Sequence, residues 1–265
     1  MSRAKRMKKN SKKENFCNFI IYVILLSILI YSGFKIYEWY KDKNNNSEIA
    51  EKIKDSVIVK EENVQENEAG SEEKTEENNQ DYTVDFNKLK EQNNEAVAWL
   101  KVNNTNIEYP VVKSRSNSFY LDHNFDKAQN LAGWIFADYK NKFDGTDKNI
   151  VIYGHNMRDG SMFGTLKNIL NSDWYNNDEN TNIILDTENE KCTYKVFAVY
   201  QIESEDYYIQ TKFKNDNEFE KFINTLKARS IKEFDTEVSK DDTILTLSTC
   251  ANNNKYRVVL HAKKM

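Results

Sequence analysis

The chain contains little proline, glycine, cysteine or histidine. Among its 265 residues there are one proline, seven glycines, three cysteines and three histidines. So little proline and glycine excludes a collagen-like or Pro/Gly-rich chain, and the sequence shows no internal repeat. The scattered cysteines and histidines form no ligand cluster, so we expect no metal and no other cofactor. The formal net charge is -4, and no nucleic-acid partner is expected.

The long uncharged run lies near the N-terminus. Residues 16–34 (FCNFIIYVILLSILIYSGF) carry no charge. As a helix they would span about 28 Å, close to the thickness of a bilayer core. Residues 1–15 contain seven Lys or Arg and one Glu, a flank that stays in the cytoplasm. We therefore predict a cytoplasmic tail over 1–15 and a single transmembrane anchor over 16–34 in the cell membrane, with the rest extracellular. A cleaved signal peptide and a buried helix of a soluble protein are the competing interpretations.

Residues 35–81 have the composition of a stalk. The stretch 61–81 holds nine acidic residues and one lysine, so it cannot bury enough surface to offset its ordering entropy and is predicted to be disordered. Within the stalk, helical spacing of three apolar residues indicates some helix over 47–59: Ile49, Ile53 and Val57. The folded domain is then 82–265, long enough for a real core.

The pattern of the folded part is mainly β. Short β-branched or alternating runs predict strands over 107–113, 132–138, 149–154, 182–187, 192–202, 243–250 and 256–262. Such short strands at close spacing favour an antiparallel barrel or sandwich over a doubly wound sheet.

Three segments have a helical pattern. Residues 85–100 place four apolar residues near one helical face: Phe86, Leu89, Val97 and Leu100. Residues 161–170 are a second candidate. Residues 217–229 repeat apolar residues at i, i+3, i+4 and i+7, which predicts an amphipathic helix: Phe219, Phe222, Ile223 and Leu226.

The three cysteines differ in their surroundings. Cys17 lies in the predicted membrane segment and cannot reach the others. Cys192 begins a strand and shares its face with Tyr194 and Val196, as a small buried side chain would. Cys250 ends an apolar strand before the polar loop ANNNK, and an unpaired extracellular thiol there indicates a reactive group. The alternatives are that Cys192 and Cys250 are both inert core thiols, or that they form a disulfide.

A nucleophilic cysteine needs a base or a charged partner, and stabilisation of the oxyanion. His155 ends the strand NIVIYGH, where Gly154 lets the backbone turn and present the ring. His123 lies among loop-like residues. His261 is about 13 Å along the last strand from Arg257, too far to share a site with it. Position therefore favours His155 as the base, with His123 second.

The arginine seven residues after Cys250 is placed to assist it. If 243–250 and 256–262 form a hairpin, the loop 251–255 brings Arg257 opposite the end of the cysteine strand. Its guanidinium would then reach the thiolate or a developing oxyanion. An ordinary exposed strand arginine is the alternative.

These residues together resemble a known family. TLSTC followed by a strand-borne Arg257, with YGHNM upstream, resembles the sortases, the cysteine transpeptidases of Gram-positive cell envelopes. MFGTLKN and the stretch YYIQTKFKNDNEF resemble class B sortases in particular. The resemblance is collinear and covers roughly 82–265.

The resemblance implies a fold and a set of residue roles. The fold is a closed eight-stranded β-barrel with an N-terminal helical portion, and with a helix in the connection 203–242 before the cysteine strand. The implied roles are Cys250 as nucleophile, His155 as acid and base, and Arg257 as stabiliser of the oxyanion or the substrate. Ala251 stands where the family often has an acidic residue. The implied substrate-groove residues are Leu121, Tyr153, Tyr208, Ile209 and Ser248.

The implied activity is covalent anchoring of a surface protein. The enzyme would cleave a sorting signal after threonine through a thioacyl intermediate, and an amino group of the peptidoglycan stem or cross-bridge would resolve it. The resemblance favours an Asn-Pro- or Ser/Pro-Pro-X-Thr-type signal over Leu-Pro-X-Thr-Gly. Two other functions remain open. A Cys–His hydrolase would use water as acceptor, and a non-enzymatic adhesin or binding module would tolerate Cys250→Ala.

Overall fold

The computed structural model describes residues 3–60, 82–250 and 255–265. The disorder predicted for 61–81 therefore lies outside the described residues. The chain divides into two compact units, Met1–Asn45 and Asn46–Met265. Helix α1 (Arg3–Val57) contributes residues to both units.

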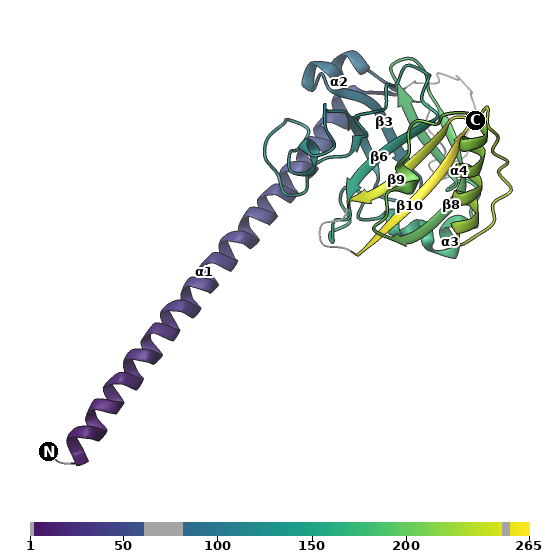
Figure 1. Cartoon of the computed structure of the whole chain (residues 1–265). Coiled ribbons are helices and arrows are strands. Elements are labelled where there is room, and N and C mark those ends of the chain that lie inside the picture. Colours follow the sequence, from purple (N-terminus) through teal and green to yellow (C-terminus); the bar gives the residue numbers. More distant parts are fainter. Residues whose placement is uncertain (1–2, 61–81, 251–254) are drawn as a thin grey trace, which may run out of the picture. The chain divides into compact units, whose positions relative to one another are not determined.

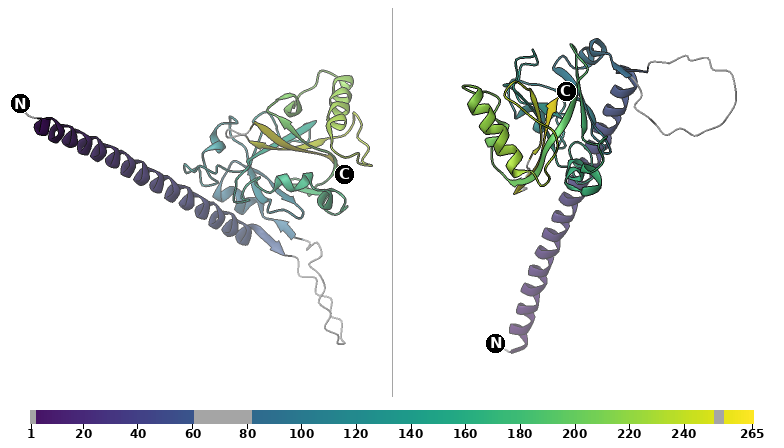
Figure 2. Two further views of the ribbon diagram at one scale, coloured as in Figure 1. Left: turned by 90° about the horizontal axis from the view of Figure 1, so that it is seen from below. Right: turned by 90° about the vertical axis from the view of Figure 1, so that its right-hand side faces the viewer.

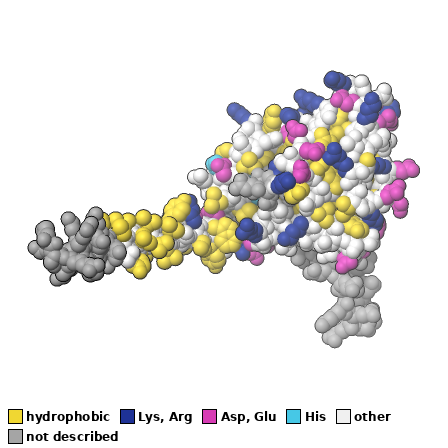
Figure 3. Space-filling model, turned by 60° about the horizontal axis from the view of Figure 1, so that its bottom comes forward, with side chains coloured by type: hydrophobic (Ala, Val, Ile, Leu, Met, Phe, Trp, Pro, Cys, Tyr) yellow, Lys and Arg dark blue, Asp and Glu magenta, His cyan; other side chains and the backbone are white. Residues whose placement is uncertain are grey.

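The first unit is helical and apolar on its surface. From Phe16 onward its large hydrophobic side chains are exposed, Leu29 and Tyr22 by more than two thirds, and Figure 3 shows apolar side chains covering this helical segment. By length and composition the helix is able to cross a membrane. It is compatible with a single-pass membrane anchor.

The second unit begins at Asn46, earlier than the predicted domain boundary at residue 82. Ile49, Ile53 and Val57 are buried in the main core cluster. Strand β1 (Ile58–Lys60) pairs antiparallel with β2 (Tyr82–Val84). The three apolar residues recur on one helical face, so they are buried only when the helix packs on the folded domain.

The core of this unit is the predicted closed β-barrel. Its strand order is β10-β8-β7-β3-β4-β5-β6-β9, closed by pairing of β9 with β10. Most neighbouring pairs are antiparallel, but β4–β5 and β6–β9 are parallel, so the barrel is mixed. The strands are β3 (Ala96–Val102), β4 (Glu108–Val112), β5 (Phe136–Ala137), β6 (Asn149–His155), β7 (Asn182–Thr187), β8 (Thr193–Glu203), β9 (Ile244–Cys250) and β10 (Tyr256–Lys264).

Helix α4 (Asp216–Arg229) covers one outer face of the barrel, as Figure 1 and both views of Figure 2 show. The four apolar residues of the predicted amphipathic face are all buried in a second core cluster, together with side chains of β8, β9 and β10. Asn215 caps the helix by accepting from the Glu218 N–H, as an N-cap side chain does. The helix predicted over 217–229 is thereby confirmed.

The helix predicted over 85–100 is wrong in its second half. Helix α2 (Phe86–Gln92) ends at Asn93, and strand β3 follows it. The Asn93 amide donates to Tyr120 Oη and to the Phe125 carbonyl, at 3.0 and 2.7 Å. These tertiary contacts hold Asn93 in an extended conformation. The following buried run fits helical and strand spacing equally well, because almost every position in it is apolar.

The segments on either side of β6 are also more irregular than predicted. Within 161–170 only the 3₁₀ helix η2 (Leu166–Leu170) forms, and helix α3 (Ser172–Tyr175) follows it. Met162 has φ 52°, which is outside the α-helical region, so a helix cannot begin at residue 161 and run through it. The strand predicted over 132–138 shrinks to β5, since Gly133 has φ 57° and leaves the β region. Two further 3₁₀ helices are η1 (Phe119–Leu121) and η3 (Tyr207–Ile209).

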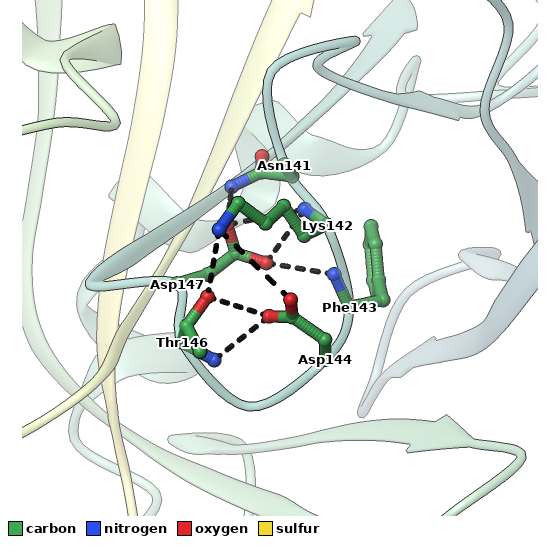
Figure 4. A network of polar contacts seen from close by, with 6 residues as sticks. All are labelled: Asn141, Lys142, Phe143, Asp144, Thr146 and Asp147. Atoms are coloured by element: carbon green, nitrogen blue, oxygen red, sulfur yellow. Dashed lines mark hydrogen bonds and ion pairs between the residues drawn. The ribbon is translucent and has the colours of Figure 1, made fainter.

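A polar loop fixes the beginning of strand β6 (Figure 4). The Asp147 carboxylate accepts hydrogen bonds from the backbone N–H of Lys142 and the amide of Asn141. The same Asn141 amide donates to the Asn149 carbonyl at 2.7 Å and accepts from the Val151 N–H at 2.9 Å. These bonds replace missing ladder partners at the first residues of β6. They set the start of the strand whose other end carries His155.

Candidate active site

His155 and Cys250 are neighbours at the ends of two parallel strands. The register of β6 and β9 runs from Asn149 opposite Ile244 to His155 opposite Cys250. Hydrogen-bonded strands lie about 4.8 Å apart, so the two backbones are close. Because the strands are parallel, both residues lie at the same end of the barrel.

The His155 ring is buried and held by a backbone carbonyl. Its exposure is 4%, and Nε2 lies 2.6 Å from the Leu121 oxygen. A carbonyl oxygen only accepts, so His155 carries a proton on Nε2 in this arrangement. Gly154 serves this geometry by its small size rather than by the turn predicted for it. A Cβ there would come within 2.5 Å of Ile135 Cδ1 and 2.7 Å of the Phe163 ring.

Arg257 lies on the strand next to the cysteine strand, as the hairpin hypothesis predicts. Strands β9 and β10 pair antiparallel, with Ser248 opposite Val259. The paired register ends at Ser248 and Val259, two residues before Cys250 and Arg257, and next to it the Val258 N–H donates to Thr249 Oγ1 at 3.0 Å. The Arg257 guanidinium donates from Nη2 to Ser204 Oγ at 3.1 Å. Residues 251–254, including Ala251, lie outside the described residues.

A cavity of about 590 Å³ opens beside this strand end. Arg257 lines it together with Asn117, Phe136, Glu205 and Thr249. All five of the groove residues that the resemblance implies also line it: Leu121, Tyr153, Tyr208, Ile209 and Ser248. These residues come from separated parts of the chain, so the fold brings the predicted set into one place. A cavity of this size accommodates a short peptide segment.

A buried carboxylate organises one wall of this cavity. Asp138, 1% exposed, accepts at Oδ2 from the Tyr153 hydroxyl and from the Asn117 amide, both at 2.8 Å. The Asn117 oxygen in turn accepts from the Tyr139 N–H at 2.9 Å. Sequence reasoning missed both residues, because Asn117 lies in a polar segment, Asp138 ends the apolar run 132–138, and neither belongs to a motif.

The other two histidines lie elsewhere. His123 is half-buried, stacks on the Phe119 ring at 4.1 Å between centroids, and contacts the Asp122 carboxylate from Nδ1 at 2.7 Å. His261 is fully buried, and burial lowers its pKa to about 3. Neither lines the cavity that contains Arg257.

Cys192 is a buried thiol, and the described residues form no metal-binding group. Cys192 is a free, buried thiol and forms no disulfide. Burial raises its pKa to about 11. Within the described ranges 3–60, 82–250 and 255–265, no group of three His, Cys, Asp or Glu is arranged to hold a metal ion.

The fold and this arrangement define the class of protein. A family model described as the sortase domain matches residues 100–265, and the chain belongs to the sortase family. It is 32% identical to sortase B of Listeria monocytogenes, over 95% of this chain and 98% of that protein. It is 28% identical to sortase B of Staphylococcus aureus, over 92% and 95%.

Solved structures give the same assignment. Sortase B of Clostridium perfringens matches with 38% identity and a TM-score of 0.64, over 68% of this chain and 99% of that one. Sortase B of Bacillus anthracis in complex with AAEK2 matches with 32% identity and a TM-score of 0.71, over 84% and 96%. The chain is a class B sortase, a cysteine transpeptidase of the group that anchors surface proteins to the cell wall.

Proposed function

We propose that Cys250, His155 and Arg257 are the catalytic residues of this transpeptidase. The register pairing of His155 with Cys250, next to a cavity lined by Arg257, is the observation that carries the proposal. In the first step the Cys250 thiolate attacks the carbonyl carbon of the threonine in a sorting signal, forming the carbon–sulfur bond. His155 gives a proton to the departing amine as the peptide bond breaks.

The second step regenerates the enzyme. A peptidoglycan amino group attacks the thioacyl carbon, the carbon–sulfur bond breaks, and the thiolate leaves while His155 takes up the proton of the amine. The product joins the surface protein to the cell wall through an amide bond. Arg257 stabilises the negative charge on the tetrahedral oxygen in both steps, since its planar guanidinium presents directed donors.

The Leu121 carbonyl has a positioning role in this mechanism. It fixes the Nε2 proton of His155 at 2.6 Å, which leaves Nδ1 for proton transfer. Leu121 also lines the cavity. One residue therefore contributes to the substrate groove and orients the acid and base.

Peptide cleavage with and without an added amine acceptor tests this proposal. Cys250→Ala should abolish cleavage and the thioacyl adduct seen by mass spectrometry, and His155→Ala should nearly do so. His123→Ala is the matched control and should keep substantial activity. Arg257→Lys keeps the charge but loses the planar fork, so we expect a rate about a hundredfold lower.

Three results would contradict the assignments. Cleavage by Cys250→Ala would overturn the nucleophile, and loss of activity in His123→Ala with full activity in His155→Ala would overturn the base. Cleavage that never transfers the peptide to an amine would favour the thiol hydrolase, with water as acceptor. A screen of short peptides that contain an Asn-Pro- or Ser/Pro-Pro-X-Thr-type signal followed by further residues would identify the substrate.

We further propose that residues 16–34 anchor the enzyme, with the N-terminus in the cytoplasm and the catalytic domain outside. The exposed apolar helix and the basic residues before it support this orientation. Protease added to intact cells should degrade the catalytic domain and spare the tail. An intact N-terminus on the membrane-bound protein, found by mass spectrometry, would exclude the cleaved signal peptide.

A further inference from the structure

A chain of buried hydrogen bonds connects four barrel strands to one wall of the cavity. The Tyr207 hydroxyl donates to Tyr200 Oη at 3.1 Å, and Tyr200 Oη lies 2.8 Å from His261 Nε2. His261 Nδ1 lies 2.9 Å from Thr246 Oγ1, which donates to Asn149 Oδ1 at 2.7 Å. Tyr200, Thr246, Asn149 and His261 are all at most 2% exposed.

The Gln210 carbonyl, at the end of this row of hydrogen bonds, determines which group donates and which accepts in each bond. Asn149 Nδ2 lies 2.9 Å from the Gln210 carbonyl oxygen, which only accepts, so the Asn149 oxygen faces Thr246. Thr246 therefore donates to Asn149 and accepts from His261. His261 must carry its proton on Nδ1, and Nε2 then accepts from Tyr200.

Burial agrees with a single proton on this ring. It lowers the pKa of His261 to about 3, so the imidazole is neutral at physiological pH. A doubly protonated ring would donate to Tyr200 Oη as well, and the Tyr200 proton would lose its acceptor. The neutral ring satisfies each buried group in the chain, which is the condition for a buried polar network to be stable.

Both ends of this chain of hydrogen bonds are attached to the same short segment, η3 and the residue that follows it. Tyr207 begins η3, and Asn149 Nδ2 binds the carbonyls of Gln210 and, at 3.4 Å, Tyr208 on its far side. Between these two points η3 carries Tyr208 and Ile209, which line the cavity. The Arg229 guanidinium covers the Tyr207 ring at 4.1 Å from its centroid and closes the outer end.

We propose that His261, as the neutral Nδ1–H tautomer, is a positioning residue that holds η3 as a wall of the substrate groove. This rests on the proposed role of the cavity as the binding site of the sorting signal. His261 lies outside the cavity and acts through the two hydrogen-bonded branches, Tyr200–Tyr207 and Thr246–Asn149. Removal of either branch frees one end of η3, and the peptide then binds a less ordered wall.

The tautomer is tested by nitrogen NMR on the full-length protein in detergent micelles, labelled with ¹⁵N-histidine. The His261 ring should show a protonated Nδ1 and an unprotonated Nε2, unchanged from pH 5 to pH 8. This signal should disappear in His261→Gln. A proton on Nε2 of His261, or titration of this ring within that range, would overturn the proposal.

Steady-state cleavage of a sorting peptide tests the positioning role. Tyr207→Phe and Thr246→Val each remove one hydroxyl and keep the bulk, so each should raise KM about 3- to 10-fold with little change in kcat, as expected for one lost hydrogen bond. Tyr194→Phe is the control, since Tyr194 is a buried tyrosine on β8 outside the chain of hydrogen bonds.

His261 itself is tested with two substitutions. His261→Phe should raise KM at least as much as Thr246→Val. His261→Gln should recover part of the loss, because an amide can accept from Tyr200 and donate to Thr246. An unchanged KM in Tyr207→Phe and Thr246→Val would overturn the positioning role. If Cys250→Ala still cleaved the peptide, the proposed catalytic function would fail instead, while the NMR result would stand.

Discussion

His155 and Cys250 are register partners on the parallel strands β6 and β9. Parallel neighbours need a long crossover connection, and here that connection contains β7, β8 and helix α4. It returns the chain so that β9 ends where β6 ends. The pair therefore depends on correct closure of the barrel, and changes that disturb the surrounding strands should affect catalysis as well as stability.

Gly133 supports the carbonyl that orients His155. Its φ is 57°, and a Cβ there would come within 2.4 Å of the Tyr120 oxygen and 2.8 Å of the Leu121 oxygen. We expect Gly133→Ala to displace the Leu121 carbonyl and lower kcat strongly. Gly145→Ala is the control, with φ 83° but no atom within 4 Å of its Cβ. Both should lose roughly 1 kcal/mol or more from backbone strain. Equal kcat values in the two variants would show that this contact does not orient His155.

Asp138 holds two residues of the cavity wall, Tyr153 and Asn117. In Asp138→Asn only one oxygen remains to accept, so one donor among the Tyr153 hydroxyl, the Asn117 amide and the Lys140 N–H loses its partner. We expect stability to fall by about 1–3 kcal/mol and KM for the sorting peptide to rise. Urea denaturation and steady-state kinetics measure the two effects. The exposed Asp126→Asn should match the wild type in both.

The pH dependence of stability should contain a contribution from His261. Burial lowers its pKa from 6.5 to about 3 in the folded protein, so below pH 6.5 the unfolded chain binds a proton that the folded protein does not. Stability should therefore fall as the pH drops from 6.5 toward 3, on the order of 1 kcal/mol per pH unit. Above pH 6.5 the ring is neutral in both states and contributes nothing.

Urea midpoints at pH 4.5, 5.5 and 7.5 measure this slope. Below pH 6.5 the free energy of unfolding of His261→Gln should depend less steeply on pH, by the contribution of about one bound proton. Parallel pH curves for the wild type and His261→Gln would contradict the prediction.

Helix α4 should contribute strongly to stability through one face. Phe222 is 7% exposed and packs against the Phe213 and Phe219 rings, 5.0 and 6.4 Å away between centroids. Phe222→Ala should cost about 3–5 kcal/mol. Lys221→Ala, one residue earlier on the exposed face, should change stability by less than about 0.5 kcal/mol. Equal melting temperatures for the two would show that the apolar face does not stabilise the fold.

The folded domain should require the part of helix α1 from Asn46 onward. Ile53 is 1% exposed in the main core cluster, so Ile53→Ala should cost about 2–5 kcal/mol. Lys52→Ala on the exposed side is the control. A protein that begins at residue 46 should melt cooperatively, and one that begins at residue 82 should melt lower or not fold. Equal melting of the two proteins would restore the boundary at residue 82.

Local patterns predicted some elements well. The amphipathic face of α4 and the buried face of Ile49, Ile53 and Val57 both follow from the 3.6-residue helical period, which requires only neighbours in the chain. The pairing of β9 with β10 follows from two apolar runs joined by a short polar loop. The same period was misleading over 85–100, because six of the seven residues of β3 are apolar and no spacing separates helix from strand.

Contacts between distant segments were not predictable in this way. Asn117 lines the cavity, and the buried Asp138 accepts hydrogen bonds from Asn117 and Tyr153, which lie in other segments of the chain. The early end of α2 depends on the bonds of Asn93 to Tyr120 and Phe125. A single sequence carries no signal for such pairs, because their spacing is not periodic.

The amino-acid sequence by itself determined the apolar N-terminal helix, the amphipathic α4 and the spacing of Cys250 and Arg257 around one hairpin loop. All three depend on residues close together in the chain, where period and turn composition are sufficient. The tertiary structure decided which histidine lies beside Cys250, which residues form the cavity and where His261 carries its proton. These depend on closing the barrel, since only closure brings β6 beside β9 and η3 beside Asn149.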